Sequence, residues 1–240
     1  MKGLLSLTLL LGLVAGCPRK GEPAPTKRQL PSVRLGRDDS SPKSRPAEDP
    51  DKTGKITVVI APPSRFFRSG GDAHHIVYLI DRSGSMVESF DAVRNEMKIS
   101  IARLRAEHDL HIILFAKGVP QEGGSRALVP ATPKNKEAAA TFLDSIRAAG
   151  QTDPLPALKR AFEVLAKADP TKPGKLIYLL TDGNFPDNAA VLALVRKLNK
   201  DKGVQINTYL YGNRPPEAVK LMTQIAEENS GRYKFVSTDE

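Results

Sequence analysis

The chain has 240 residues, 40% of them hydrophobic, which is enough for one sizeable folded core. Its 36 Lys and Arg outnumber its 27 Asp and Glu, giving a formal net charge of +9. This excess is spread out: residues 56–240 hold 25 bases and 21 acids, without a basic run of five. Trp is absent, and Tyr78, Tyr178 and Tyr209 lie inside predicted strands, so no aromatic platform for stacking bases is expected. Composition therefore indicates a solvated basic surface and argues against nucleic acid as a partner.

The N-terminus has the layout of an export signal. Lys2 precedes an apolar run over residues 4–14, and the small residues Ala15 and Gly16 follow it. The run is too short to span a bilayer, which needs about 20 residues. Cys17, the single cysteine, comes next, and Val14-Ala15-Gly16-Cys17 resembles the lipobox of bacterial lipoproteins. The resemblance implies a signal peptide over residues 1–16, a lipid on Cys17, and an extracytoplasmic place in the bacterial cell envelope. The alternative is an ordinary secretory signal with an incidental cysteine.

Residues 17–55 differ in composition from the rest of the chain. They contain seven prolines, ten bases and six acids but few apolar residues. Such a segment cannot bury enough surface to offset the entropy lost on ordering, so we expect a disordered tether. Residues 56–240 are predicted to form a single domain, in which residues 56–74 are an N-terminal extension with a short strand at Ile56–Ile60.

From residue 76 onward, strand and helix patterns alternate. Continuous apolar runs predict buried strands, and apolar residues three or four positions apart predict amphipathic helices. The predicted strands are Ile76–Ile80, His111–Phe115, Arg126–Val129, Leu176–Leu180, Gln205–Leu210 and Arg232–Val236. The predicted helices are Met86–Glu107, Ala138–Ala148, Leu155–Ala166, Ala189–Leu198 and Pro216–Glu228. This alternation predicts an α/β fold with a mostly parallel sheet and helices on both of its faces.

Three segments carry oxygen ligands: Asp81-Arg82-Ser83-Gly84-Ser85, Gly150-Gln151-Thr152-Asp153 and Thr181-Asp182-Gly183. The first and third directly follow apolar strands, so each places its carboxylate at the carboxyl end of a strand. Carboxylates and hydroxyls are hard ligands, which suit Mg²⁺, Mn²⁺ or Ca²⁺ better than zinc. The sequence therefore predicts one divalent-cation site. Its predicted ligands are Asp81, Ser83, Ser85, Thr152 and Asp182.

Each of these segments also has a simpler explanation. Ser83 and Ser85 precede a predicted helix, where serines commonly act as caps, and Asp182 in Thr-Asp-Gly suits a turn. Asp153 and Asp187 either support the cation site or are turn and surface residues. Because three such segments occur together, we favour the metal site over the separate explanations.

Asp81-x-Ser83-x-Ser85, Thr152 and Asp182, in that order, match the metal ion-dependent adhesion site of von Willebrand factor A-like domains. The resemblance covers about residues 75–236. It implies a doubly wound, Rossmann-like sheet of six strands in the order 3-2-1-4-5-6, whose third strand is an antiparallel edge. It also implies that the hydroxyls coordinate the cation directly or in one state of the site, and that the two aspartates hold it largely through water.

Neutral ligands in the first shell leave a divalent cation under-neutralised and able to accept a further anionic ligand. We therefore expect Mg²⁺, or Mn²⁺ or Ca²⁺ in its place, to bind an Asp or Glu carboxylate of a partner protein. The alternative function is a scaffold domain whose metal site is structural or vestigial and which binds through another surface.

Enzymatic activity is not expected. Ser83 lies outside a Gly-x-Ser-x-Gly motif, and the chain has no Gly-x-x-x-x-Gly-Lys phosphate loop. His74 and His75 precede the first strand of the alternating pattern, whereas the serines follow it, so neither is placed as a base. A hydrolytic metal centre would need more acidic ligands and a dedicated base.

Overall fold

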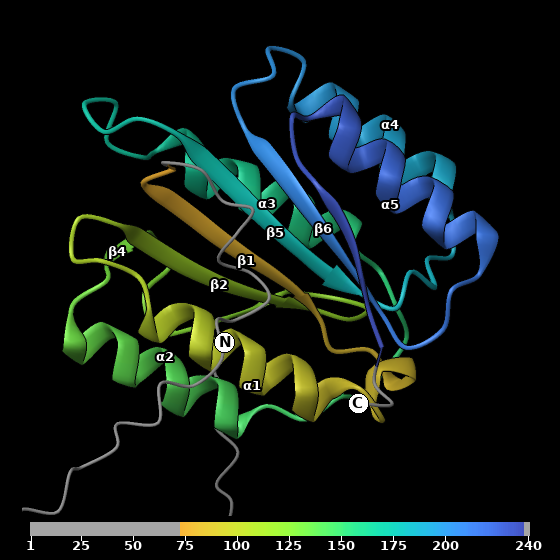
Figure 1. Ribbon diagram of the computed structural model, residues 1–240, viewed down its shortest axis with the longest axis horizontal. Helices are drawn as coiled ribbons and strands as arrows, with labels where there is room; N and C mark the ends of the chain where they lie inside the picture. The colour runs from red at the N-terminus through yellow and green to blue at the C-terminus, as the bar shows by residue number, and fades with distance from the viewer. Residues whose placement is uncertain (1–72, 238–240) are drawn as a thin grey trace, which may run out of the picture. The chain divides into compact units, whose positions relative to one another are not determined.

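A computed structural model describes residues 73–237 of the chain (Figure 1). The predicted signal peptide, the tether and the strand at Ile56–Ile60 lie outside the described residues, so they stay predictions. None of the helices within residues 73–237 combines the length and the apolar character needed to cross a bilayer.

The described residues form a mixed sheet in the order β3-β2-β1-β5-β6-β7, with β4 also paired to β2. Strands β1, β2, β5, β6 and β7 are parallel, and β3 and β4 run antiparallel to β2. The order confirms the expected doubly wound α/β sheet with an antiparallel edge. The strands are β1 (His75–Asp81), β2 (Asp109–Phe115), β3 (Gln121–Glu122), β4 (Val129–Pro130), β5 (Lys175–Thr181), β6 (Gln205–Tyr211) and β7 (Tyr233–Val236).

The antiparallel edge differs from the prediction. Instead of one strand at Arg126–Val129, two strands of two residues each pair with β2, so the described sheet has seven strands rather than six. Pro130 has no backbone N–H to donate, so β4 cannot extend as a regular ladder strand. Gln121 and Glu122 carry no hydrophobic pattern, and β3 was therefore not predicted.

Five α-helices and one short 3₁₀ helix complete the described part: η1 (Gly84–Met86), α1 (Phe90–Ala102), α2 (Pro133–Ser145), α3 (Leu155–Ala166), α4 (Asn188–Leu198) and α5 (Pro216–Glu228). The predictions for α3 and α5 are confirmed to the residue. The single helix predicted over Met86–Glu107 is wrong at both ends. Met86 belongs to η1 and Leu104 follows α1, but both are buried and so extend the apolar periodicity beyond the helix.

The prediction for α2 is shifted. The helix begins at Pro133, five residues before the expected start, because Thr132 caps it by accepting a hydrogen bond from the Asn135 backbone N–H. It ends at Ser145, and Ile146 already has an extended backbone.

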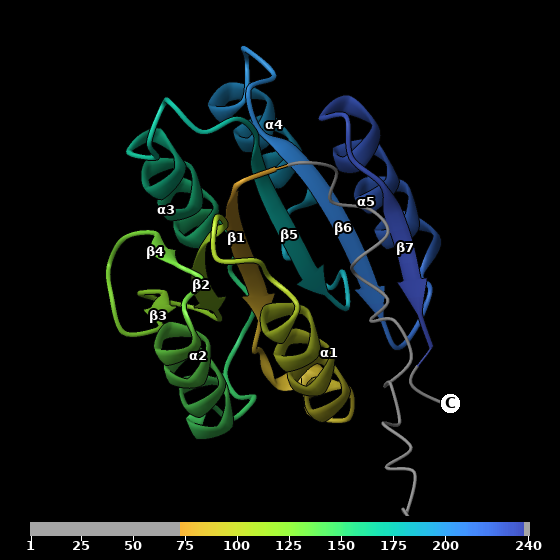
Figure 2. The same cartoon turned by 60° about the vertical axis from the view of Figure 1, so that its left-hand side comes forward.

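Helices cover both faces of the sheet: α1 and α2 lie on one, and α3, α4 and α5 on the other (Figures 1 and 2). Strand β1 shows the two-sided burial, since Tyr78 and Ile80 pack with α1 and α2, whereas Val77 and Leu79 pack with the other three helices. Strand β1 is thus buried over its whole length and ends at Asp81.

The chain leaves β1 toward β2 in one direction and returns to pair β5 on the other side of β1. The winding of the sheet therefore reverses at the β1–β5 pair, and a doubly wound sheet has its crevice beyond the carboxyl ends of such strands. The segments after β1 and β5 are those that carry Asp81 and Asp182.

Candidate metal centre

Asp81 forms the buried centre of the site. Its carboxylate accepts a hydrogen bond from the backbone N–H of Ser83 (2.8 Å) and another from the Thr181 hydroxyl (2.7 Å). The second bond joins the ends of the neighbouring strands β1 and β5. Asp81 has no solvent-exposed surface, so the fold itself fixes the direction of this carboxylate.

The two predicted serine ligands lie side by side. Ser83 is buried, Ser85 is exposed, and their hydroxyl oxygens are 3.1 Å apart. Ser83 precedes η1, but its side chain makes no capping hydrogen bond, and α1 starts later, at Phe90. The Ser83 side chain therefore does not cap the following helix, and its hydroxyl instead lies within hydrogen-bond distance of the Ser85 hydroxyl.

Asp182 follows directly after β5 and is buried. Both of its carboxylate oxygens accept hydrogen bonds from Asn184, one from the backbone N–H and one from the side-chain amide, each 3.1 Å long. Asp182 thus also shapes the turn after β5, as the simpler explanation held. Thr181 and Asn184, which orient the two carboxylates, were not predicted. The signal for Asn184 was its place two residues after Asp182, the spacing of an Asx turn.

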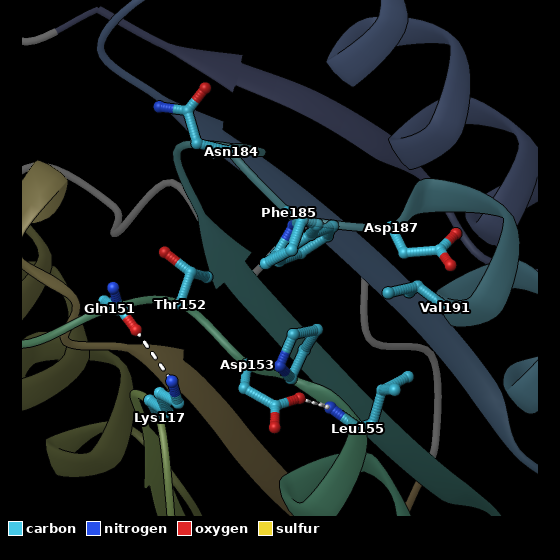
Figure 3. Close-up of a pocket in the computed structure, with 11 residues that line it drawn as sticks. Lys117, Gln151, Thr152, Asp153, Leu155, Asn184, Phe185, Asp187 and Val191 are labelled. Atoms are coloured by element: carbon cyan, nitrogen blue, oxygen red, sulfur yellow. Dashed lines mark hydrogen bonds between the residues drawn. The ribbon is translucent and has the colours of Figure 1, made fainter.

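Backbone hydrogen bonds connect the loop that carries Thr152 to the other candidate ligands' segments. The Gly84 N–H donates to the Gly150 carbonyl (2.8 Å), and the Ala149 N–H donates to the Arg82 carbonyl (2.7 Å). On the other side, the Lys117 N–H donates to the Gln151 carbonyl. Main-chain bonds therefore tie the Thr152 loop both to the Asp81–Ser85 segment and to the end of β2. Thr152 and Asn184 line the same cavity from different loops (Figure 3).

The site is electrostatically unbalanced without a cation. Burial raises the pKa of Asp81 from 3.8 to about 6, although hydrogen bonds from Ser83 and Thr181 oppose the rise. The nearby carboxylate of Asp182 raises it further. A divalent cation between these groups would stabilise the ionised form of Asp81.

These residues fit a hard divalent cation. They offer two carboxylates and three hydroxyls at the edge where the winding of the sheet reverses, and hard oxygen donors are what Mg²⁺, Mn²⁺ and Ca²⁺ prefer. Within residues 73–237, no group of three or more His, Cys, Asp and Glu side chains could hold a metal ion. A cation at this edge would therefore need the hydroxyls of Ser83, Ser85 and Thr152 in addition to the two aspartates.

A cavity of about 690 Å³ opens beside Thr152 (Figure 3). Asp153 and Asp187 line it, and each starts a helix: Asp153 accepts a hydrogen bond from the Leu155 N–H (3.1 Å), and Asp187 accepts one from the Ala190 N–H (2.9 Å). These bonds give both aspartates the turn and helix-start role. The cavity is lined by Lys117, Gln151, Thr152, Asp153, Pro154, Leu155, Asn184, Phe185, Pro186, Asp187 and Val191.

Residues 76–184 match the family model of the von Willebrand factor type A domain. The protein YfbK of Escherichia coli (strain K12) is 28% identical over 173 residues, which are 69% of this chain and 29% of that protein. Inter-alpha-trypsin inhibitor heavy chain H1 of Bos taurus is 27% identical over 173 residues, 69% of this chain and 19% of that protein. The chain thus spans less than a third of the length of these two relatives.

Solved structures share the fold. The von Willebrand factor type A protein from Catenulispora acidiphila superposes with a TM-score of 0.59 at 21% identity, covering 69% of this chain and 39% of that one. The manganese-loaded TRAP protein of Plasmodium vivax gives a TM-score of 0.54 at 17% identity over 70% of each chain. The described residues therefore form a domain with the von Willebrand factor type A fold, and residues 76–184 carry the sequence pattern of that family.

Proposed function

We propose that this protein binds an Asp or Glu carboxylate of a partner protein through a divalent cation, Mg²⁺ or else Mn²⁺ or Ca²⁺. Asp81, Ser83, Ser85, Thr152 and Asp182 would hold the cation. The observation that carries the proposal is the buried Asp81 carboxylate, which lies beside Asp182 and near a pair of hydroxyls at the edge where the sheet reverses its winding. A cation balances the aspartates, and a carboxylate from a partner completes its coordination.

Two solved structures with the same fold are in keeping with this role. The TRAP protein of Plasmodium vivax was crystallised loaded with manganese, and SpaC from Lactobacillus rhamnosus GG, with a TM-score of 0.57 at 17% identity, is a pilus adhesin. Neither catalysis nor nucleic-acid binding is part of the proposal. His75 lies at the start of β1, at the opposite end of the strand from the serines.

The proposal predicts metal binding followed by metal-dependent carboxylate binding. The full chain is expected to bind Mg²⁺ or Mn²⁺ in calorimetric titration, and then to bind a peptide with a single Glu in fluorescence anisotropy. Both signals should disappear with Asp182→Ala, and EDTA should release the peptide. A matched peptide with Gln in place of Glu is the control, because it keeps the shape but lacks the charge. Equal binding of the Glu and Gln peptides would refute metal-mediated recognition.

The alternative, a structural or vestigial metal site, gives a different result. In that case EDTA lowers the melting temperature of the chain, but a partner identified by cross-linking from envelope extract stays bound. In our proposal, EDTA removes that partner as well.

We further propose that a lipid on Cys17 anchors the protein in the bacterial cell envelope, outside the cytoplasm. Mass spectrometry of the mature protein should show Cys17 as a lipid-modified first residue, and Cys17→Ser should move the protein out of the membrane fraction. The apolar chains of the lipid supply the membrane affinity, at about 0.8 kcal/mol per buried CH₂ group. An unmodified Cys17 behind an intact leader would contradict this prediction.

A further inference from the structure

Exposed hydrophobic side chains mark the edge of the domain that carries the metal centre. Within residues 73–237, the large hydrophobic side chains that stand out in solvent are Val87, which is 61% exposed, and Val119, which is 85% exposed. Val87 follows η1, and Val119 lies between β2 and β3, so both belong to segments that leave the carboxyl ends of the parallel strands. Two exposed valines are unremarkable alone, but both lie in loops at the edge of the sheet that carries the candidate site.

The cavity beside Thr152 adds a hollow to the same edge. It lies where α3 and α4 begin, and five of its lining residues are apolar. In Figure 3, the side chains of Phe185, Leu155 and Val191 face one another across it. Pro154 and Val191 are buried, and Leu155 and Phe185 are half-buried, so the walls are firmly packed into the fold. Its volume of about 690 Å³ is within the range of pockets that take a ligand group.

We propose that this cavity receives a hydrophobic side chain of the partner, of the Phe or Leu type, from a position close to the carboxylate that binds the cation. The inference rests on the proposed function. It is based on Thr152, which is a predicted cation ligand and also lines the cavity, so that the cavity adjoins the candidate metal centre. Consecutive residues of an extended peptide advance by about 3.3–3.6 Å, so the test covers positions up to three residues on either side of the acidic one.

The charges around the cavity restrict the motif further. Asp153 and Asp187 place two carboxylates at its lining, against the single cation of Lys117, whose ammonium group donates to the Gln151 side chain (3.0 Å). A second acidic side chain would be repelled there, whereas an apolar side chain only needs contact with the walls. The preferred motif thus combines one acidic residue for the cation with one hydrophobic residue for the cavity.

A set of synthetic peptides tests this inference on the full chain. Each peptide consists of Gly and Ser with one Glu, and carries one Phe at a different position from three residues before to three residues after the Glu. Peptides with Glu alone and with Phe alone are the references. With Mg²⁺ or Mn²⁺ present, at least one position of Phe should strengthen binding about tenfold or more over Glu alone, and EDTA should abolish the binding.

Two matched variants test whether the tighter binding of the Phe peptide arises in this cavity. Phe185→Ala removes an aromatic wall of the cavity and should eliminate the advantage of the Phe peptide while metal binding and the affinity for the Glu-alone peptide stay unchanged. Phe142→Ala is the control, because Phe142 is also half-buried but lies on α2, on the other face of the sheet. It should leave the advantage intact.

The possible outcomes are distinct. If all Glu peptides bind equally well and need the metal, the proposed function stands and the cavity inference is overturned. An advantage that survives Phe185→Ala overturns it as well. If the chain binds the metal but no Glu peptide, the proposed function fails, and the inference fails with it. Should Phe185→Ala not fold, the peptide series on the unchanged chain still decides.

Discussion

Asp81→Asn is expected to stabilise the metal-free chain and to abolish its response to Mg²⁺. The ionised Asp81 is buried without a cation, and its pKa of about 6, compared with 3.8 for an exposed aspartate, means that the fold disfavours its charge. Asn removes the charge and keeps the shape. At pH 7.5 in EDTA, the free energy of unfolding should rise on the order of 2 kcal/mol, since one pKa unit corresponds to about 1.4 kcal/mol. Denaturant unfolding of both chains measures this difference.

The difference in stability between the two chains should reverse when metal is added and disappear at acid pH. Saturating Mg²⁺ should stabilise only the chain with Asp81, by about 2.7 kcal/mol at one hundred times the dissociation constant. Because the folded-state pKa lies above the unfolded one, the deficit caused by Asp81 is complete above about pH 6 and disappears as the pH falls toward 4. The two metal-free chains should therefore approach equal stability at pH 4. A lower stability of Asp81→Asn in EDTA at pH 7.5 would show that the carboxylate is not under electrostatic strain.

Gly183→Ala is expected to destabilise the domain strongly and to disturb the metal centre. Gly183 has a φ of +78°, and an added Cβ would lie 2.5 Å from the Ala218 Cβ on α5 and 2.9 Å from the Leu210 Cδ1 on β6. Left-handed strain amounts to about 1 kcal/mol, and overpacking adds about 1–3 kcal/mol. We expect a loss of about 2–4 kcal/mol in the free energy of unfolding. Because Gly183 follows Asp182, Mg²⁺ affinity measured by calorimetry should fall as well.

Gly212→Ala is the matched control for this prediction. Gly212 has a similar φ of +74°, but no atom would lie within 4 Å of its added Cβ. This variant should lose only about 1 kcal/mol, the part due to backbone strain, and should bind Mg²⁺ normally. Equal losses in the two variants would mean that contact with α5 does not hold the Asp182 segment in place.

Long apolar periodicity made most of the fold predictable. Strands such as His75–Asp81 are buried on both faces, so their composition reveals them, and Leu155–Ala166 begins with a Pro in its first turn. The edge of the sheet could not be predicted in the same way. Strands β3 and β4 consist of two residues each and exist only through pairing with β2, which no local pattern records.

The candidate site, too, could be predicted from the sequence only in part. Its five candidate ligands could be proposed from the sequence because Asp, Ser and Thr stand immediately after strands or in a short loop with a characteristic order. The hydrogen bond from Thr181 to Asp81 could not be predicted, because the two residues are 100 positions apart and meet only through the β1–β5 pairing. The cavity beside Thr152 is likewise formed by loops from different parts of the chain.

The main-chain bonds that hold the Thr152 loop bear on how this site can change in evolution. Carbonyls and N–H groups of Arg82, Gly84, Ala149 and Gly150 make the links to the Asp81–Ser85 segment, and backbone groups are the same in every residue except proline. The side chain of Gln151 can therefore vary, and with it the preference for a partner, while the hydroxyl of Thr152 stays in place; Gly150, with a φ of +91°, has to remain a glycine. The length of the loop cannot vary in this way, because one added or lost residue would shift the register of these bonds. Loop length, more than loop sequence, is the quantity on which this metal centre depends.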